Sequence, residues 1–256
     1  MVMQKNSNQP RKNNEKTILK NCSNIAEVTG NTHSAGMIGT SNVTKIEVSN
    51  CTSENSHINV KNGDIGGIIG TAFVEEVNIT DCTINNNVIS NMGNEEEITN
   101  GKAGGIIGSH QASNEDITAA STLYLTINNC EIIDTEINSK QDTGGIVGSI
   151  IVGNHEKAGV NIDECSVVNL TSKTQAKDVY ANSAGIIGTI FHVKDATITN
   201  SYVERSNITL TTNANRANGN VAGICALNHV CIEDIDSKLI IKDCNVSSSN
   251  INGDYI

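Results

Sequence analysis

Tryptophan is absent from this chain of 256 residues, and proline occurs only once, at Pro10. Aromatic residues make up 2% of the sequence, too few to form the stacking platforms on which proteins bind single-stranded nucleic acid. No apolar run approaches the roughly 18 residues of a membrane-spanning helix, so we expect no membrane insertion. The charged amino terminus has no apolar segment behind it and does not look like a secretory signal peptide, which makes a cytoplasmic location one expectation.

Positive charge is also scarce beyond the first 20 residues. The chain carries 17 Lys and Arg against 28 Asp and Glu, a net charge of −11, and five of those basic residues lie at positions 5–20. An acidic body repels phosphate backbones, so direct nucleic-acid binding is not expected. Residues 1–16 are polar and predict a disordered tail, whereas residues 17–256 form one repeat domain.

A glycine box, Gly-Gly-Ile-Ile-Gly at residues 66–70, recurs along this domain with small changes. Its successive copies are 31, 38, 40, 40 and 38 residues apart, which is typical of a repeat protein. No Lys-Ser or Lys-Thr follows the box, and its repetition argues against a phosphate-binding loop. The second glycine of each copy marks one structural position: Gly36, Gly67, Gly105, Gly145, Gly185 and Gly223.

A second box reads apolar-x-x-Cys, and Ser201 replaces the cysteine in one copy. Its cysteines are 29 to 79 residues apart, far from metal-motif spacing, so we expect a buried ladder of small side chains and neither a metal nor another cofactor. Cys225 and Cys231 lie outside this ladder and are the candidates for a reactive or paired thiol. The ladder cysteines are Cys22, Cys51, Cys82, Cys130, Cys165 and Cys244.

The spacing inside the second box predicts a corner. Strand side chains alternate with period two, yet Ile79 and Cys82 are three residues apart, so one residue must be absorbed by a bend. The residue before the cysteine position is Asn or Asp in six copies, and these residues tolerate the left-handed conformation of a sharp corner. Glu164 occupies the position in the remaining copy and predicts a corner of different shape.

Short β-branched strands, separated by Gly and Asn, favour an all-β fold over a helical one. We expect a strand, a corner, a second strand, a variable loop and a glycine-flanked third strand in each repeat. This order predicts a parallel β-solenoid, most simply a right-handed β-helix, of about six coils stacked about 4.8 Å apart. The hydroxyl residues after each glycine box then form a ladder of their own: Thr40, Thr71, Ser109, Ser149 and Thr189.

The alternation of (Ala/Gly)-Gly-Ile-(Ile/Val)-Gly with Ile-x-(Asn/Asp)-Cys resembles the GLUG-motif repeats over residues 17–256. Such repeats occur in bacterial surface proteins and in the non-catalytic part of zinc-type immunoglobulin A peptidases. The resemblance implies a repetitive, surface-exposed or secreted β-structure that presents or spaces other domains. It carries over no catalytic residue, because the zinc motif of the peptidases is missing here.

These observations predict a non-enzymatic, adhesin-like binding or spacer module whose protein or glycan ligand contacts the variable loops. One alternative is a polysaccharide lyase or glycoside hydrolase on a parallel β-helix, with acidic groups gathered in a groove. Another is an intracellular acidic rod that mimics DNA, with two outer rows of carboxylates. The last coil has no room for a cap, so we expect its end to stack on another copy or an adjoining domain. The variable loops are 85–102, 111–122, 153–159 and 173–183.

Overall fold

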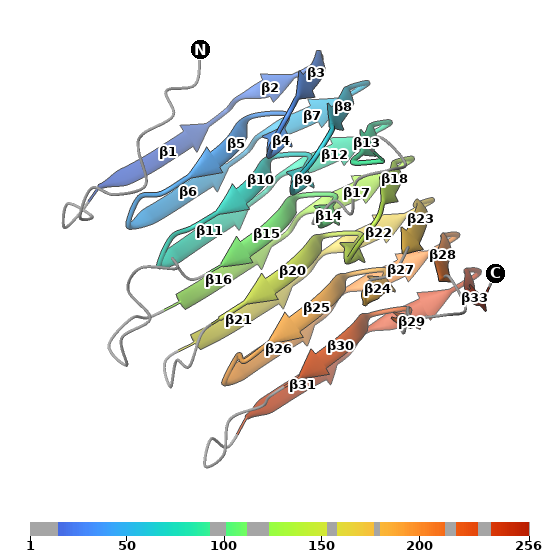
Figure 1. The fold of residues 1–256 in the computed structure, drawn as a ribbon. Coiled ribbons are helices and arrows are strands. Elements are labelled where there is room, and N and C mark those ends of the chain that lie inside the picture. The colour runs from blue at the N-terminus through green and yellow to red at the C-terminus, as the bar shows by residue number, and fades with distance from the viewer. Residues whose placement is uncertain are drawn as a thin grey trace.

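The computed structural model describes residues 15–92, 101–111, 123–152, 158–176, 180–212, 219–229 and 237–255. Every regular element in this part of the chain is a β-strand, and every strand pairing is parallel (Figure 1). No helix in the described ranges is long and apolar enough to cross a membrane. The all-β, parallel solenoid expected from the repeats is therefore confirmed.

Five parallel sheets, which we call A to E in the order the chain visits them, run along the stack (Figure 1). Sheets A, B and C contain seven strands each, and sheets D and E contain six. The chain thus forms six complete coils and the first three strands of a seventh. Each coil contains five short strands, whereas the sequence predicted three, because the corners within a repeat divide the extended segments further.

Sheet A contains β1 (Lys16–Lys20), β6 (Lys45–Ser49), β11 (Glu76–Thr80), β16 (Leu123–Asn128), β21 (Ala158–Asp163), β26 (Asp195–Thr199) and β31 (Lys238–Lys242). Sheet B contains β2 (Ser23–Asn24), β7 (Thr52–Glu54), β12 (Thr83–Asn85), β17 (Glu131–Ile133), β22 (Ser166–Val168), β27 (Tyr202–Glu204) and β32 (Asn245–Ser247). Sheet C contains β3 (Glu27–Gly30), β8 (His57–Val60), β13 (Val88–Ser90), β18 (Glu136–Ser139), β23 (Thr171–Ala176), β28 (Asn207–Thr212) and β33 (Asn250–Tyr255).

The other two sheets flank the glycine boxes. Sheet D contains β4 (Ser34–Ala35), β9 (Ile65–Gly66), β14 (Ala103–Gly104), β19 (Thr143–Gly144), β24 (Ala181–Ala184) and β29 (Gly219–Ala222). Sheet E contains β5 (Ile38–Ser41), β10 (Ile69–Ala72), β15 (Ile107–Gln111), β20 (Val147–Ile151), β25 (Ile187–Phe191) and β30 (Cys225–His229).

The corner between sheets A and B lies where the spacing predicted it. All seven residues before the cysteine position have positive φ angles, between 48° and 55°. Glu164 shares this geometry with a φ of 52°, so the expectation of a differently shaped corner there is wrong. The neighbouring rungs impose the same path on its backbone: the N–H of Glu164 donates to the Thr199 carbonyl, as that of Asn129 donates to the Asp163 carbonyl. Tertiary pairing therefore overrides the local preference.

The interior consists of aliphatic side chains stacked rung upon rung. In sheet A the inward row Val48, Ile79, Ile127, Ile162 and Ile198 is at most 1% exposed. Each such side chain stabilises the fold by roughly 1.5–3 kcal/mol through burial. The equivalent side chain in the last described rung, Ile241, is 46% exposed. A coil therefore depends on the next one to complete its core.

The cysteine position forms the expected ladder of small side chains. Cys51, Cys82, Cys130 and Cys165 are buried, and all the cysteines in the described ranges are free thiols. Each thiol donates to the carbonyl two residues earlier, as Cys82 does to Thr80 at 3.2 Å. Ser201 takes the same place in its rung, where its hydroxyl donates to the Thr199 carbonyl at 2.7 Å.

Candidate functional surfaces

The glycine box bends the chain into a tight arch between sheets D and E. A Cβ atom at Gly108, the third glycine of its box, would lie 2.5 Å from the Ile65 carbonyl oxygen and 2.6 Å from that of Gly70, both in the preceding coil. Only glycine permits so close an approach of two backbones. The second glycine, such as Gly67, faces the carbonyl of the next coil's box in the same way. The box is a packing device used once per coil, as the sequence predicted.

The arch also brings together two rows of polar side chains. The hydroxyl ladder expected from the sequence is present, since Thr71 pairs with Thr40 and Ser109, and Ser149 pairs with Ser109 and Thr189. A second row stands at the start of sheet D, three residues before the second glycine of each box. We call it the acceptor ladder; its members are His33, Asp64, Lys102, Asp142, Asn182 and Asn220.

Along the acceptor ladder, the side chain of one member accepts a hydrogen bond from the backbone N–H of the member in the next coil. The Asp64 N–H donates to His33 Nδ1 at 3.1 Å, and the Lys102 N–H donates to Asp64 Oδ1 at 3.0 Å. The pattern resumes beyond Lys102, where the Asn182 N–H donates to Asp142 Oδ1 at 3.0 Å and the Asn220 N–H to Asn182 Oδ1 at 3.2 Å. Lys102 interrupts the pattern because an ammonium group cannot accept a hydrogen bond.

Thr71, His33 and Asp64 have the composition of a hydrolytic triad but not its geometry. The Thr71 hydroxyl donates to Asp64 Oδ2 at 2.9 Å, and His33 Nδ1 lies 2.7 Å from the same hydroxyl while accepting the Asp64 N–H. A nucleophile needs a base that takes its proton and an open approach for the substrate. Thr71 is fully buried and bonded directly to the carboxylate, so the cluster fits a structural role.

Asp142 is the second carboxylate of the acceptor ladder. Burial raises the pKa of its carboxyl group, against the opposing effect of hydrogen bonds from Thr189 and Asn182 and the nearby charge of Lys102. These partners are supplied by neighbouring coils and fix the side chain within the arch. The arrangement couples adjacent coils.

The pKa values of the thiols shift in both directions: hydrogen bonding with the Cys130 thiol lowers those of Cys82 and Cys165, whereas burial raises that of Cys51. Burial raises the pKa of Cys225 to about 12, so this cysteine, expected to be a reactive candidate, stays protonated at neutral pH. Contact with the thiols of Cys165 and Cys82, together with burial, raises the pKa of Cys130. Cys231 lies outside the described residues. Among the described residues, no group of three or more His, Cys, Asp or Glu side chains is arranged to hold a metal ion.

The internal segments that lie outside the described residues are flanked by strands of the same two pairs of sheets. The strands that flank residues 93–100, 177–179 and 213–218 belong to sheets C and D, and those that flank 112–122, 153–157 and 230–236 belong to sheets E and A. Parts of the expected loops are regular strands instead: β13 lies within 85–102, and the end of β23 and the start of β24 lie within 173–183. Continued pairing with the neighbouring coils holds those parts extended. We call the remaining segments the inserts.

Two of the six aromatic residues, Tyr124 and Tyr180, lie close in sequence to these inserts. At the carboxyl-terminal ends of two sheet E strands, the Phe191 ring of β25 stacks on the His229 ring of β30, with centroids 5.2 Å apart. The Phe191 ring also packs on the ring of His192, with centroids 4.0 Å apart. Tyr124 is the second residue of β16, which follows one insert, and it is 46% exposed. Tyr180 follows another insert and is 71% exposed. Exposed tyrosines supply much of the energy at many binding interfaces, so the insert-bearing corners have suitable contact residues.

The outward faces of the sheets are mainly neutral and polar. One outward row of sheet A reads Glu47, Asn78, Thr126, Asn161 and Thr197. Carboxylates near the amino-terminal end pair with lysines, as Glu76 does with Lys45 at 2.6 Å. The described strands therefore carry no continuous row of carboxylates along the stack.

Sequence reasoning identified the boxes, the corner and the hydroxyl ladder but missed the acceptor ladder and the second left-handed corner, between sheets B and C. A signal for the ladder was present, because the residue three before the second glycine is polar in all six copies. The second corner has positive φ at Asn55, Asn86, Asp134 and Asn169, but Arg205 and Ser248 in later copies hide its pattern.

Comparison of the chain with protein-family models, with curated proteins and with solved structures found no match.

Proposed function

We propose that this protein is a non-enzymatic β-solenoid that spaces or presents binding surfaces, and that a protein or glycan ligand contacts the inserts. The observation that carries this proposal is the confinement of the inserts to two corners of an otherwise constant coil. A rigid repeat with variable segments along one or two edges is the usual design of a repeat-protein binding surface. The exposed Tyr124 and Tyr180 beside the inserts support it.

The resemblance of the boxes to GLUG-motif repeats supports an adhesin-like role at a bacterial cell surface or in a secreted protein. The chemistry of the interior agrees with a passive scaffold, because many buried polar groups bond to groups of a neighbouring coil, as Asn87 does to Ser53 and Thr174 to Thr143. A lyase or hydrolase would need acidic groups gathered in a groove, and a DNA mimic would need outer rows of carboxylates. The described strands carry mainly Asn, Ser and Thr outward, which favours the binding-scaffold proposal over both.

The test compares the full chain with a variant in which residues 93–100, 112–122 and 153–157 are replaced by short turns. Compact corners of the same chain, such as residues 42–44 between β5 and β6, supply the turn sequences. Both proteins are probed against a glycan array and a displayed library of extracellular protein domains. We expect the full chain to bind at least one probe and the shortened variant to lose that binding while remaining folded.

A matched control changes outward residues away from the inserts, for example Thr83→Ala on sheet B. Binding that survives the loss of the inserts but not Thr83→Ala would contradict the proposal. A folded full chain that binds none of the probes would contradict the binding role in the proposal and would leave only the spacer role.

A further inference from the structure

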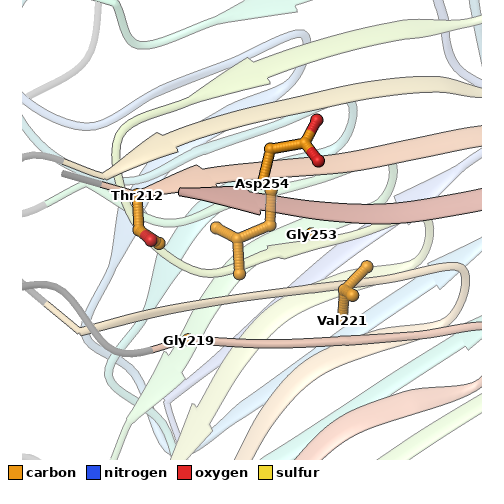
Figure 2. Close-up of a pocket in the computed structure, with 6 residues that line it drawn as sticks. Thr212, Gly219, Val221, Gly253 and Asp254 are labelled. Atoms are coloured by element: carbon orange, nitrogen blue, oxygen red, sulfur yellow. The ribbon is translucent and has the colours of Figure 1, made fainter. Parts of the chain in front are cut away.

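The tripeptide Asn-Gly-Asp occurs twice in the chain, at residues 62–64 and 252–254. The first copy begins in the bend between β8 and β9, and the second lies within β33. Figure 2 shows Gly253 and Asp254 of the second copy on their strand, beside a hollow of about 240 Å³. The same local sequence therefore stands in two backbone settings, and a difference in reactivity between the copies reports on the fold.

An Asn-Gly sequence is chemically labile because its backbone can close on the asparagine side chain. The glycine nitrogen attacks Cγ of the asparagine, and the amide nitrogen leaves as ammonia together with the proton of the glycine N–H. The product is a cyclic imide, which water then opens. Cleavage of the bond to Cγ gives aspartate, and cleavage of the bond to the main-chain carbonyl carbon gives isoaspartate. Glycine favours the attack because it has no Cβ to hinder the approach.

Asn62 meets the requirements of this reaction. Its side chain is exposed and makes no hydrogen bond with any described residue. Hydrogen bonds to the preceding coil lie on both sides of the reacting atoms: the Asn62 N–H donates to the Asn31 carbonyl at 3.0 Å, and the Asp64 N–H donates to His33 Nδ1 at 3.1 Å. Between them, the Asn62 carbonyl and the Gly63 N–H make no bond within the described ranges. Rotation of this peptide group toward Cγ therefore breaks none of the described bonds.

The backbone geometry separates the two copies. Gly63 has a φ of 112°, and it is the one glycine of the described ranges in the left-handed region. In β33, by contrast, Asn252 and Gly253 pair with Thr209 and Leu210 of β28. An extended strand points each side chain out of the sheet while the next N–H lies in the sheet plane, so Cγ and the attacking nitrogen are held apart. Asn252 is also exposed, so solvent access does not distinguish the copies.

We propose that Asn62 is a site of spontaneous deamidation, and that strand pairing protects Asn252 from the same reaction. Isoaspartate adds one methylene group to the backbone at this position. The two hydrogen bonds from Asn62 and Asp64 to the preceding coil need a fixed backbone length between them. The longer backbone displaces at least one of these bonds, which loosens the packing of the second coil on the first.

The experiment incubates the purified full chain in mildly alkaline buffer and follows both asparagines by mass spectrometry of the digested protein. In the folded chain we expect Asn62 to be converted at least tenfold faster than Asn252, because β33 must open locally before its asparagine reacts. In denaturing urea the strand is lost, so the two copies should react at similar rates. An isoaspartate methyltransferase, which labels only the iso form, should label the incubated folded chain at residue 62.

Asn62→Gln is the matched control, because the longer side chain would have to close a larger ring. Circular dichroism checks that this variant folds. We expect it to show no conversion at residue 62 and to leave the slow conversion of Asn252 unchanged. After incubation, the parent should have a lower urea midpoint than Asn62→Gln treated in the same way.

Equal rates at the two sites in the folded chain, faster conversion of Asn252, or no conversion of Asn62 would overturn the proposal. Formation of aspartate without isoaspartate would overturn it too, because direct hydrolysis does not pass through the imide. An incubated parent that keeps the midpoint of the control would contradict the loosened packing. None of these measurements involves a ligand, so their outcome is independent of the insert-binding proposal.

Discussion

The Thr71 hydroxyl donates a 2.9 Å hydrogen bond to the Asp64 carboxylate, although an entire glycine box separates the two residues. The bond closes the arch between sheets D and E, and the same closure recurs between Asn182 and Thr189 at 3.0 Å. The glycine box has the composition of a ligand-binding loop, but the polar side chains on either side of it bond to each other. The predictions below test whether the repeated positions act as a scaffold.

Ser201 should be interchangeable with cysteine but not with alanine. Its hydroxyl accepts the Cys165 N–H at 3.1 Å, as the Cys51 thiol accepts the Cys22 N–H at 3.4 Å. We expect Ser201→Ala to lower the free energy of unfolding by about 1–3 kcal/mol, because a buried N–H loses its acceptor. Ser201→Cys should stay within about 1 kcal/mol of the parent in urea denaturation. Equal losses in the two variants would show that the acceptor is unimportant.

His110 should make the fold sensitive to acid. It is fully buried, its Nε2 donates to the Val74 carbonyl at 3.0 Å, and its Nδ1 has no partner among the described residues. Burial lowers the pKa of His110 from 6.5 to about 4. Between these two pH values the unfolded chain binds a proton that the folded chain does not, so stability falls as pH decreases from 6.5 to 4, by about 3 kcal/mol at most.

The neighbouring rungs indicate the compensating variant for His110. Ile150 and Ile190 occupy the equivalent positions in the next two coils, so His110→Ile should fit the interior. We expect this variant to be more stable than the parent at pH 5. Its free energy of unfolding should fall less steeply than the parent's between pH 6.5 and 4, because the contribution of His110 is gone. His57→Gln, at an exposed position of sheet C, serves as control and should leave the slope unchanged. An unaltered slope in His110→Ile would assign the acid sensitivity elsewhere.

How far the sequence could predict this molecule depends on how local each feature is. The left-handed corner before Cys82 is encoded by residue spacing and by Asn or Asp, and it was predicted. The side-chain pairing between coils, by contrast, includes contacts such as that of Gln111 with Asp64, 47 residues apart, and a polar residue at a repeated position does not reveal which partner it meets. Glu164 shows a second limit, since pairing with the adjacent coils imposes a left-handed conformation that glutamate disfavours.

Lys102 offers a stabilising substitution. It is the one member of the acceptor ladder that cannot accept a hydrogen bond, and Lys102→Asn would place an acceptor beside Asp142. We expect the free energy of unfolding to rise by about 0.5–1.5 kcal/mol, measured by urea denaturation. Lys102→Leu removes the same charge without adding an acceptor, and it should be no more stable than the parent. A gain that is equal in both variants would trace the effect to the charge.

Thiol labelling should report on unfolding. Cys51, Cys82, Cys130 and Cys165 are at most 1% exposed, and burial raises the pKa of Cys225 to about 12. Only thiolates react with iodoacetamide at an appreciable rate, so we expect these five cysteines to remain unmodified in the native protein and to react after denaturation. Mass spectrometry of the digested protein identifies each site. Rapid native labelling of Cys130 would show that the ladder opens.

The most direct test compares the denaturation midpoint of Gly108→Ala with that of the chain whose insert at 112–122 is replaced by a short turn. The new methyl group of Gly108→Ala would lie 2.5 Å from the Ile65 carbonyl oxygen, so we expect destabilisation by about 1–3 kcal/mol or more. Gly39→Ala, at the same box position in the first coil, meets one backbone oxygen at 3.1 Å and should cost much less. If the boxes are the scaffold and the inserts are not, the shortened chain keeps the parent's midpoint while Gly108→Ala falls clearly below it. A parent-like Gly108→Ala together with an unstable shortened chain would contradict the account.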